Sequence, residues 1–339
     1  MKCFELHATN GIDGLKPAER AMPQPGPHQL VVKVKAAALN YRDLMIVGGG
    51  YGGGRALKMP LIPLSDGAGE VMAVGAGVSG VKIGDRVCGI FFQRWIAGPV
   101  RPDIQEAALG GTADGMLTEY ALLEGDGVVR VPDHLSFEEA ATLPCAALTA
   151  WHGLVEAGGI KPGDAVLLLG TGGVSIFGLQ FARLAGARAI VLSSSDEKLA
   201  RAQQMGASAA INYRQVTEWQ DRVREATDGR GVDHVLEVTG GETTQRVLAA
   251  MRPGGHIAII GARSGPGGEL DRRVVLQRGL RVTGINVGSR AMFEAMNRAI
   301  AANGLKPVVD RRFPFEQAVE AYRAFGTGQH FGKVVITLG

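Results

Sequence analysis

Hydrophobic spacing divides the chain into two kinds of region. Before residue 135 the apolar segments are short, and residues 30–37 (LVVKVKAA) alternate apolar side chains with lysines. Alternation with period two is typical of a strand with one buried face. Two more strands are predicted at 69–74 and 85–90, with glycine-rich turn sequence over 75–84. Many short strands joined by glycine turns predict a small, barrel-like β unit.

From Ser136 onward, strand and helix patterns alternate. Ser136 and Glu139 have capping-box spacing before the apolar run 140–155, which Pro144 is expected to divide into two helices. Strands are predicted at 165–169, 189–192, 209–211, 235–238 and 256–260, and helices at 174–185, 196–205, 218–227 and 243–251. Strands that alternate with helices form a parallel sheet covered on both faces, which predicts a doubly wound fold.

The last fifty residues return to a different pattern, with a helix near 291–303, a strand at 308–313, a helix from Phe315 and a closing strand at 333–338. The closing strand has no helical crossover of its own, so we expect it to fold back onto the N-terminal β unit. The domain boundary is then crossed twice. We predict an α/β chain in which residues 1–127 and 290–339 form the β-rich domain and residues 128–289 the doubly wound one.

Composition narrows the class of protein. The 339 residues are 46% hydrophobic and 20% charged, as in soluble globular proteins. The net charge of +3 comes without a block of Lys or Arg, so no nucleic-acid partner is predicted. No apolar run approaches the roughly 20 residues that span a bilayer, and the first residues lack a signal sequence, which predicts a cytoplasmic protein with no membrane partner. Three distant cysteines predict no disulfide framework.

A glycine-rich turn follows the strand at 165–169 and leads directly into a helix. This context is typical of a dinucleotide site, in which Gly170 permits the tight turn and Gly172 lets the backbone approach a pyrophosphate. Ser175 replaces the third glycine and is small enough for close helix–strand packing. The alternative is an ordinary tight loop without a ligand. The predicted contacts at this turn are Gly170, Thr171, Gly172, Gly173 and Val174.

The end of the second strand indicates which dinucleotide is bound. Ser193, Ser194 and Ser195 stand where NAD sites place a carboxylate for the ribose, and Lys198 follows. Serine hydroxyls and a lysine suit a 2′-phosphate, so Ser193, Ser194 and Lys198 predict NADP(H). Lys198 could instead be a solvated surface lysine, and Asp196 is interpreted as the N-cap of the next helix.

Several short motifs, taken in order, resemble the medium-chain dehydrogenase/reductase superfamily and its zinc-independent, quinone oxidoreductase-like branch. They are Asn40-Tyr41-Arg42-Asp43, residues 63–71, Gly84-Asp85-Arg86-Val87, Leu148-Thr149-Ala150-Trp151, the glycine turn, Asn212-Tyr213-Arg214, residues 229–233 and Gly332-Lys333-Val334-Val335. The resemblance covers nearly the whole chain. It implies a GroES-like catalytic domain that is interrupted by a Rossmann domain.

The same resemblance argues against a metal. Zinc-dependent relatives carry a catalytic Cys where this chain has Tyr41 or Arg42, and Gly-His-Glu where it has residues 64–66 (LSD). They also have a four-cysteine lobe, whereas residues 91–115 contain no cysteine. The seven histidines show no ligand pairing in the sequence and are interpreted as surface or singly hydrogen-bonded residues. No metal is therefore predicted.

The resemblance implies further cofactor contacts and a dimer. Thr149 resembles the threonine near the nicotinamide, and Tyr213 the tyrosine beside the adenosine 2′-phosphate, although Tyr213 could equally be a half-buried aromatic at a strand end. The remaining implied contacts are Thr239, Gly240, Ile260, Gly261, Ala262, Asn286, Val287, Gly288, Phe331 and Lys333. Relatives pair the edge strands of two Rossmann sheets, and the strand near 280–285 is apolar enough to do the same, which predicts a homodimer.

An oxidoreductase without a metal has no Lewis acid for an alcohol substrate, whereas reduction of a quinone or an α,β-unsaturated carbonyl needs only hydrogen-bond donors for the developing anion. The candidate donors are Tyr51, in a glycine loop, and Asn40, which could instead orient the nicotinamide or the pocket. Tyr51 could equally anchor its loop. Phe92 and Trp95 could select flat apolar substrates or belong to the core.

These patterns predict hydride transfer from NADPH to a small, apolar, electrophilic quinone or enone. Two alternatives stay open: an NAD(P)-dependent alcohol dehydrogenase or ketone reductase, and a non-catalytic NADPH-binding protein that kept the fold.

Overall fold

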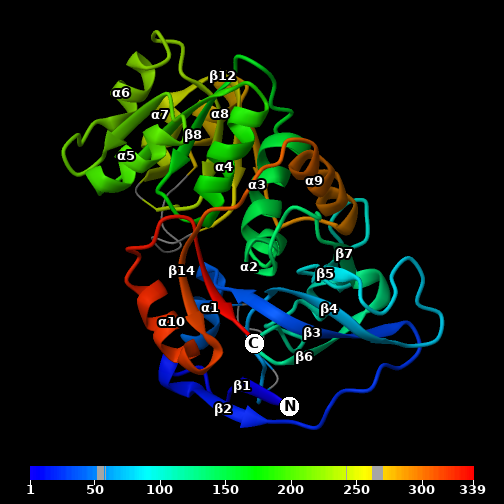
Figure 1. The fold of residues 1–339 in the computed structure, drawn as a ribbon. Helices are drawn as coiled ribbons and strands as arrows, with labels where there is room; N and C mark the ends of the chain where they lie inside the picture. The colour runs from blue at the N-terminus through cyan, green and yellow to red at the C-terminus, as the bar shows by residue number, and fades with distance from the viewer. Residues whose placement is uncertain (52–56, 58, 242, 262–269) are drawn as a thin grey trace. The chain divides into compact units, whose positions relative to one another are not determined.

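A computed structural model describes residues 1–51, 57, 59–241, 243–261 and 270–339 (Figure 1). The chain forms two compact units, Met1–Leu148 with Val287–Gly339, and Thr149–Asn286. The first boundary therefore lies about twenty residues beyond the predicted 127/128. Helix α2 (Phe137–Ala140) belongs to the first unit, where the thiol of Cys88 donates to Ala140 O at the end of this helix. No helix in the described part of the chain could cross a membrane.

The first unit is built on a β-sheet with the order β14-β15-β3-β4-β5-β7, in which β6 also pairs with β3; β1 and β2 form a separate pair. The strands are β1 (Lys2–Leu6), β2 (Leu15–Glu19), β3 (Gln29–Ala38), β4 (Asp66–Val74), β5 (Arg86–Gly89), β6 (Tyr120–Glu124), β7 (Val128–Arg130), β14 (Val309–Pro314) and β15 (Lys333–Thr337). Strand β3 contains the predicted alternating segment, and its apolar positions are buried. The predicted β-rich unit is thus confirmed.

The closing strand returns to the N-terminal unit, as expected. Strand β15 pairs antiparallel with β3, with Val335 opposite Ala38, and parallel with β14. The helices of this unit include α1 (Tyr41–Val47), α9 (Arg290–Ala302) and α10 (Ala318–Gly326). Helix α1, which was not predicted, begins directly after β3. The backbone N–H of Asn40 there donates to Asp43 Oδ2 at 2.8 Å and thereby stabilises the first turn.

The segment around Pro144 differs from the two helices expected. The capping box is present, because Ser136 Oγ accepts the Glu139 N–H at 3.1 Å and Glu139 Oε2 accepts the Ser136 N–H at 2.8 Å. Beyond α2, however, residues 143–147 and 152–156 form wide π-type turns on either side of the short helix α3 (Leu148–Trp151). Pro144 lies in the first of these turns, where a missing N–H leaves no acceptor unsatisfied.

The second unit is a doubly wound parallel sheet with the order β10-β9-β8-β11-β12-β13. Its strands are β8 (Ala165–Leu169), β9 (Arg188–Ser193), β10 (Ala209–Asn212), β11 (Val232–Glu237), β12 (Met251–Ile259) and β13 (Arg281–Gly284), and its helices include α4 (Gly173–Leu184), α5 (Asp196–Gln204), α6 (Trp219–Glu225), α7 (Thr243–Ala250) and α8 (Arg272–Arg278). Every residue of β8 and β11 is buried, as expected of central strands covered on both faces. The Rossmann topology is confirmed.

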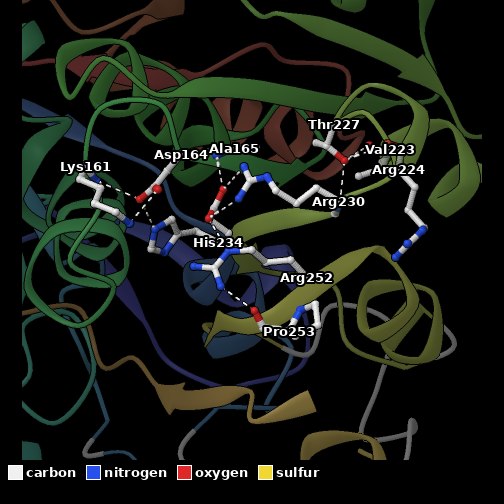
Figure 2. A network of polar contacts seen from close by, with 12 residues as sticks. Lys161, Asp164, Ala165, Val223, Arg224, Thr227, Arg230, His234, Arg252 and Pro253 are labelled. Atoms are coloured by element: carbon white, nitrogen blue, oxygen red, sulfur yellow. Dashed lines mark hydrogen bonds and ion pairs between the residues drawn. The ribbon is translucent and has the colours of Figure 1, made fainter. Parts of the chain in front are cut away.

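A polar network joins the amino ends of β8 and β11 (Figure 2). Asp233 accepts hydrogen bonds from the Ala165 N–H and from both terminal nitrogens of Arg230, and Arg252 Nε also donates to it. These donors hold the pKa of Asp233 well below its usual range. Beside it, Asp164 Oδ2 lies 3.0 Å from His234 Nε2. The network satisfies buried charges at the end of the sheet opposite the glycine turn.

His256 is a buried histidine next to this network, and we expect it to make folding sensitive to acid. Burial, Arg281 and His234 lower its pKa from 6.5 to about 4. The histidine is therefore neutral in the folded chain and protonated below pH 6.5 in the unfolded chain, so stability present above pH 6.5 is lost as the pH falls toward 4. The expected loss is about 3 kcal/mol in the free energy of unfolding.

Urea unfolding at several pH values, followed by circular dichroism, measures this effect against a His256→Gln variant. Glutamine can still hydrogen-bond to Thr283 Oγ1, which lies 3.1 Å from His256 Nε2, but it does not titrate. The variant should lose less stability than the wild type between pH 6.5 and 4. Identical pH dependences would contradict the role given to His256.

Candidate functional site

The glycine turn lies at the carboxyl end of β8, the central strand of the second unit. Gly170 has φ +81°, a conformation that a side chain would strain, and its N–H donates to Leu192 O of the neighbouring strand β9 at 2.8 Å. Thr171 follows, buried, and Gly172 is the N-cap of α4. Gly173 and Val174 form the first turn of that twelve-residue helix, whose leading N–H groups have no intrahelical acceptor.

Gly172 leaves room for a ligand at this turn. Its φ of −78° is available to any residue, and a Cβ placed there would meet no described atom within 4 Å. Neither the backbone conformation nor the packing of the chain therefore requires glycine at this position. A pyrophosphate against the backbone N–H groups at the start of α4 does require it, because a side chain would fill the same space. The turn fits a dinucleotide.

Close packing of α4 on the sheet depends on a glycine that the sequence analysis missed. A Cβ at Gly178 would lie 2.7 Å from Leu168 Cδ2 and 2.8 Å from Leu236 Cδ1, so this glycine lets the helix approach the strands. Ser175, predicted to replace the third glycine, is buried and donates its hydroxyl hydrogen to Leu169 O at 2.8 Å. The spacing of eight residues between Gly170 and Gly178 was the sequence signal that could have identified this packing glycine.

The predicted 2′-phosphate residues gather at the ends of β9 and β10. The Tyr213 N–H donates to Ser193 O at 3.1 Å, which joins the two strand ends, and Tyr213 is 42% exposed. Ser193 is buried, whereas Ser194 and Lys198 are partly exposed. These residues lie close together, and their contact with a phosphate stays a prediction.

Asp196 differs from its interpretation as an N-cap. Ser195 caps α5 through Oγ, which accepts the Lys198 N–H, and Asp196 is the first residue within the helix. Its carboxylate accepts hydrogen bonds from Asn212 Nδ2 at 2.7 Å and Gln215 Nε2 at 2.9 Å. Both carboxylate oxygens are thus engaged by amide groups of the chain.

Glu237, at the end of β11, organises the next loop and was also missed. Its Oε1 accepts hydrogen bonds from the N–H groups of Thr239 at 2.7 Å and Gly240 at 2.9 Å, and from the Thr239 hydroxyl. Ile260 and Gly261, after β12, both donate their N–H groups to Glu237 O. The predicted residues after β11 and β12 therefore meet at one edge of the sheet. Ala262 lies outside the described residues.

The other predicted cofactor contacts are divided between the units. Thr149, buried, and Asn286 belong to the second unit, whereas Val287, Gly288, Phe331 and Lys333 belong to the first. Gly288 packs on Leu148, since a Cβ there would lie 2.7 Å from Leu148 Cγ. Phe331 is only 1% exposed. Contact of these residues with a cofactor stays a prediction.

A second candidate site lies in the first unit and is centred on the ammonium group of Lys333. Lys333 Nζ donates to Asn40 Oδ1 at 2.6 Å and to Leu39 O at 2.7 Å, and it lies 3.5 Å from Asp66 Oδ2. Lys333 is 2% exposed and Asp66 is fully buried. Ser65 Oγ donates to the other oxygen of Asp66 at 2.9 Å. The buried ammonium and carboxylate thus neutralise each other beside Asn40.

Arg42 extends this cluster toward Tyr51. Its guanidinium carbon lies 4.7 Å from the centre of the Tyr51 ring and 4.8 Å from that of Phe91, and Nη1 donates to Leu109 O at 2.9 Å. Arg42 Nη1 also lies 3.3 Å from Asp43 Oδ1. Burial raises the pKa of Asp43 to about 6 against the opposing effect of Arg42. Tyr51, predicted as a donor, therefore contacts Arg42 of helix α1, and Asn40 is the N-cap of that helix.

The aromatic residues of the following segment form core structure. Phe91, Phe92 and Trp95 are each at most 3% exposed and pack with Ile104 and Ala108. Trp95 Nε1 also donates to Gly98 O at 2.9 Å. The core interpretation of Phe92 and Trp95 is confirmed.

Comparison with known proteins identifies the family. The alcohol dehydrogenase GroES-like domain matches residues 26–133, and the zinc-binding dehydrogenase domain matches residues 173–302. A zinc-type alcohol dehydrogenase-like protein of Schizosaccharomyces pombe is 45% identical over 97% of this chain and 96% of its own. This chain belongs to the medium-chain dehydrogenase/reductase superfamily. It is an oxidoreductase of that superfamily.

Other members are similar over their full lengths. Human quinone oxidoreductase is 28% identical and covers 100% of this chain and 98% of its own. A solved structure described as an NAD-dependent alcohol dehydrogenase has a TM-score of 0.90 and 36% identity, with both chains covered completely. The superfamily members and the glycine turn together support a nicotinamide dinucleotide as the cofactor.

Zinc appears in the names of several members of the superfamily, but the residues of the Lys333 cluster do not suit this metal. A zinc site needs three or four thiolate, imidazole or carboxylate ligands that converge. Asn40, Ser65 and Asp66 offer one carboxylate, and the ammonium of Lys333 already occupies the space between Asn40 and Asp66. The described ranges contain no group of three His, Cys, Asp or Glu that could hold a metal ion.

Proposed function

We propose that this dehydrogenase/reductase belongs to the zinc-independent, quinone oxidoreductase-like branch and transfers hydride from NADPH to a quinone or an α,β-unsaturated carbonyl. The observation that carries the proposal is the buried Lys333 ammonium, held by Asn40 and Asp66 in a cluster that offers a metal ion only one carboxylate ligand. The similarity to quinone oxidoreductase supports the same reaction class.

Such a reaction suits a site that offers hydrogen bonds and a fixed positive charge. When bound, NADPH supplies the hydride. Addition of the hydride to the β-carbon of an enone moves the π electrons toward the carbonyl group, and the carbonyl oxygen becomes negative. A proton added at the α-carbon then completes the reduction. The residues of the first unit then have one task, to stabilise the negative oxygen. Asn40, and Tyr51 through its hydroxyl, are the proposed donors.

The preference for NADPH over NADH rests on the end of β9. The chain places Ser193, Ser194 and Lys198 there, and the nearby carboxylate of Asp196 is engaged by Asn212 and Gln215. Because those amides orient the carboxylate and share its acceptor sites, it is a weaker acceptor for a ribose 2′-hydroxyl group. The serine hydroxyls and the lysine favour a phosphorylated ribose.

Turnover with a panel of compounds tests the proposal. We expect oxidation of NADPH with 1,4-naphthoquinone and 2-cyclohexenone, and a value of kcat/KM at least about 10-fold lower with NADH, equivalent to about 1.4 kcal/mol. The matched compound is cyclohexanone, which keeps the carbonyl but lacks the C=C bond. Oxidation with cyclohexanone, or reduction of NADP⁺ by alcohols alone, would favour the alcohol dehydrogenase suggested by the names of other members. Tight NADPH binding without turnover would favour a binding protein.

We also propose a homodimer. Strand β13 is at the edge of the parallel sheet, with β12 as its neighbour on one side. Pairing with the same strand of a second copy would cover the free edge.

A further inference from the structure

Asn40 carries an amide donor that the chain itself leaves unused. Its Nδ2 is buried and has no hydrogen-bond partner in the described part of the chain, although the whole residue is only 7% exposed. An unsatisfied buried donor costs about 1–3 kcal/mol and therefore points to a ligand. The opposite side of the same amide is held firmly, because Oδ1 accepts from Lys333 Nζ at 2.6 Å.

We propose that Lys333 is a positioning residue that fixes the orientation of the Asn40 amide, so that Nδ2 donates a hydrogen bond to the oxygen of the reducible substrate. This inference rests on the proposed function and adds to it the residue that prepares the donor. This role of Lys333 lies within the first unit and is separate from the cofactor contact that the family resemblance implied, which stays a prediction.

The orientation follows from the chemistry of the two groups. An ammonium group has three donors and no acceptor, so only the oxygen of the amide can face it. The reversed amide would place two N–H donors against the positive charge. Lys333 therefore turns Nδ2 away from itself, toward the side on which the chain provides no acceptor. An amide held by a charged donor is also polarised, which strengthens the hydrogen bond that its N–H group donates.

Backbone structure holds this pair in register. Lys333 is the first residue of β15, and the Leu39 N–H donates to Val334 O at 3.0 Å, which brings the end of β3 alongside the start of β15. The N–H of Asn40 is held by Asp43 Oδ2 at 2.8 Å. Main chain and side chain of Asn40 are thus both fixed before any substrate binds, as expected of a preorganised donor.

The carboxylate of Asp66 allows the charge to remain buried. Asp66 Oδ2 lies 3.5 Å from Lys333 Nζ, and Ser65 donates to Oδ1. A buried ammonium without a counter-ion would destabilise the fold by several kcal/mol. The pair is close to neutral overall, and the amide of Asn40 is the polar group through which it acts on a ligand.

An Asn40→Asp variant distinguishes the role of Oδ1 from that of Nδ2. Aspartate keeps an acceptor for Lys333 but replaces the Nδ2 donor with an oxygen that repels a developing anion. We expect kcat with 1,4-naphthoquinone to fall about 100-fold. The dissociation constant for NADPH should change less than about threefold, or 0.7 kcal/mol. The thermal midpoint reports whether the variant is folded.

A double-mutant cycle tests whether Lys333 acts through Asn40. Lys333→Met is made together with Asp66→Asn, so that no charge is left unpaired in the core. In this background Asn40→Ala should lower kcat less than about threefold, whereas in the wild-type chain it should lower kcat about 100-fold. Equal effects in both backgrounds would show that Lys333 is merely structural. If the paired background does not fold, the Asn40→Asp comparison alone decides the donor.

The outcomes separate this inference from the proposed function. If none of the quinones and enones tested supports NADPH oxidation by the wild-type chain, the proposed function is wrong. A wild-type chain that turns over while Asn40→Asp retains kcat within threefold overturns the inference alone. Weaker NADPH binding in Asn40→Asp with unchanged kcat also overturns it, because Asn40 then serves the cofactor and not the substrate.

Discussion

Replacement of Gly69 with alanine is expected to destabilise the first unit by about 3 kcal/mol or more, at the upper end of the usual cost of overpacking. Gly69 lies in the middle of β4, between Val34 of β3 and Val87 of β5. A Cβ there would lie 2.1 Å from Lys33 O and 2.8 Å from Val32 Cγ1. Because the nearest atom belongs to the backbone of a paired strand, relief requires breaking the β3–β4 ladder.

Urea unfolding of purified Gly69→Ala measures this effect, and failure to accumulate as soluble protein would agree with it. Gly326→Ala is the matched control in the same unit. Its Cβ would come no closer than 3.9 Å to Leu44 Cδ2, and alanine is the better helix former at the end of α10. The control should be as stable as the wild type or up to about 1 kcal/mol more stable. If Gly69→Ala unfolds at the same urea concentration as the control, strands β3 and β4 can move apart without a loss of stability, and the prediction is wrong.

Gly172→Val is expected to weaken NADPH binding about 100-fold, equivalent to about 2.7 kcal/mol. Valine suits the extended conformation of this residue, with φ −78° and ψ −177°, and meets no described atom at Cβ. The fold therefore tolerates it at the modest cost of a poorer N-cap, about 1 kcal/mol. Only a pyrophosphate at the start of α4 would collide with the new side chain.

Titration calorimetry with NADPH gives the affinity, and thermal unfolding gives the stability. Gly163→Ala is the matched control, because Gly163 precedes β8 and lies at the opposite end of that strand from Gly172. Its φ of +85° would strain alanine by about 1 kcal/mol, although nothing described lies within 4 Å of the added Cβ. The control should lose stability but keep its affinity. If Gly172→Val binds NADPH normally, the dinucleotide does not lie against this turn.

The sequence predicted the second unit more completely than the first because its elements are local and regular. Strand β8 was predicted with its exact bounds from five consecutive apolar residues, and most helices of this unit lie within two residues of the prediction. The central strands β8 and β11 of the doubly wound sheet are buried on both faces, so hydrophobic runs alone reveal them. Helix α1 was missed, although the interval between Asn40 and Asp43 is the spacing of a capping pair.

By itself the sequence determined the two-part architecture, the return of the closing strand and the glycine turn, since each depends on neighbouring residues or on hydrophobic periodicity. Only the tertiary structure brought Lys333 to Asn40, which is 293 residues away in the chain, and placed both beside Asp66. No local pattern contains that contact, because it depends on the pairing of β15 with β3. The same pairing decides which side of the Asn40 amide is held and which remains available for a ligand.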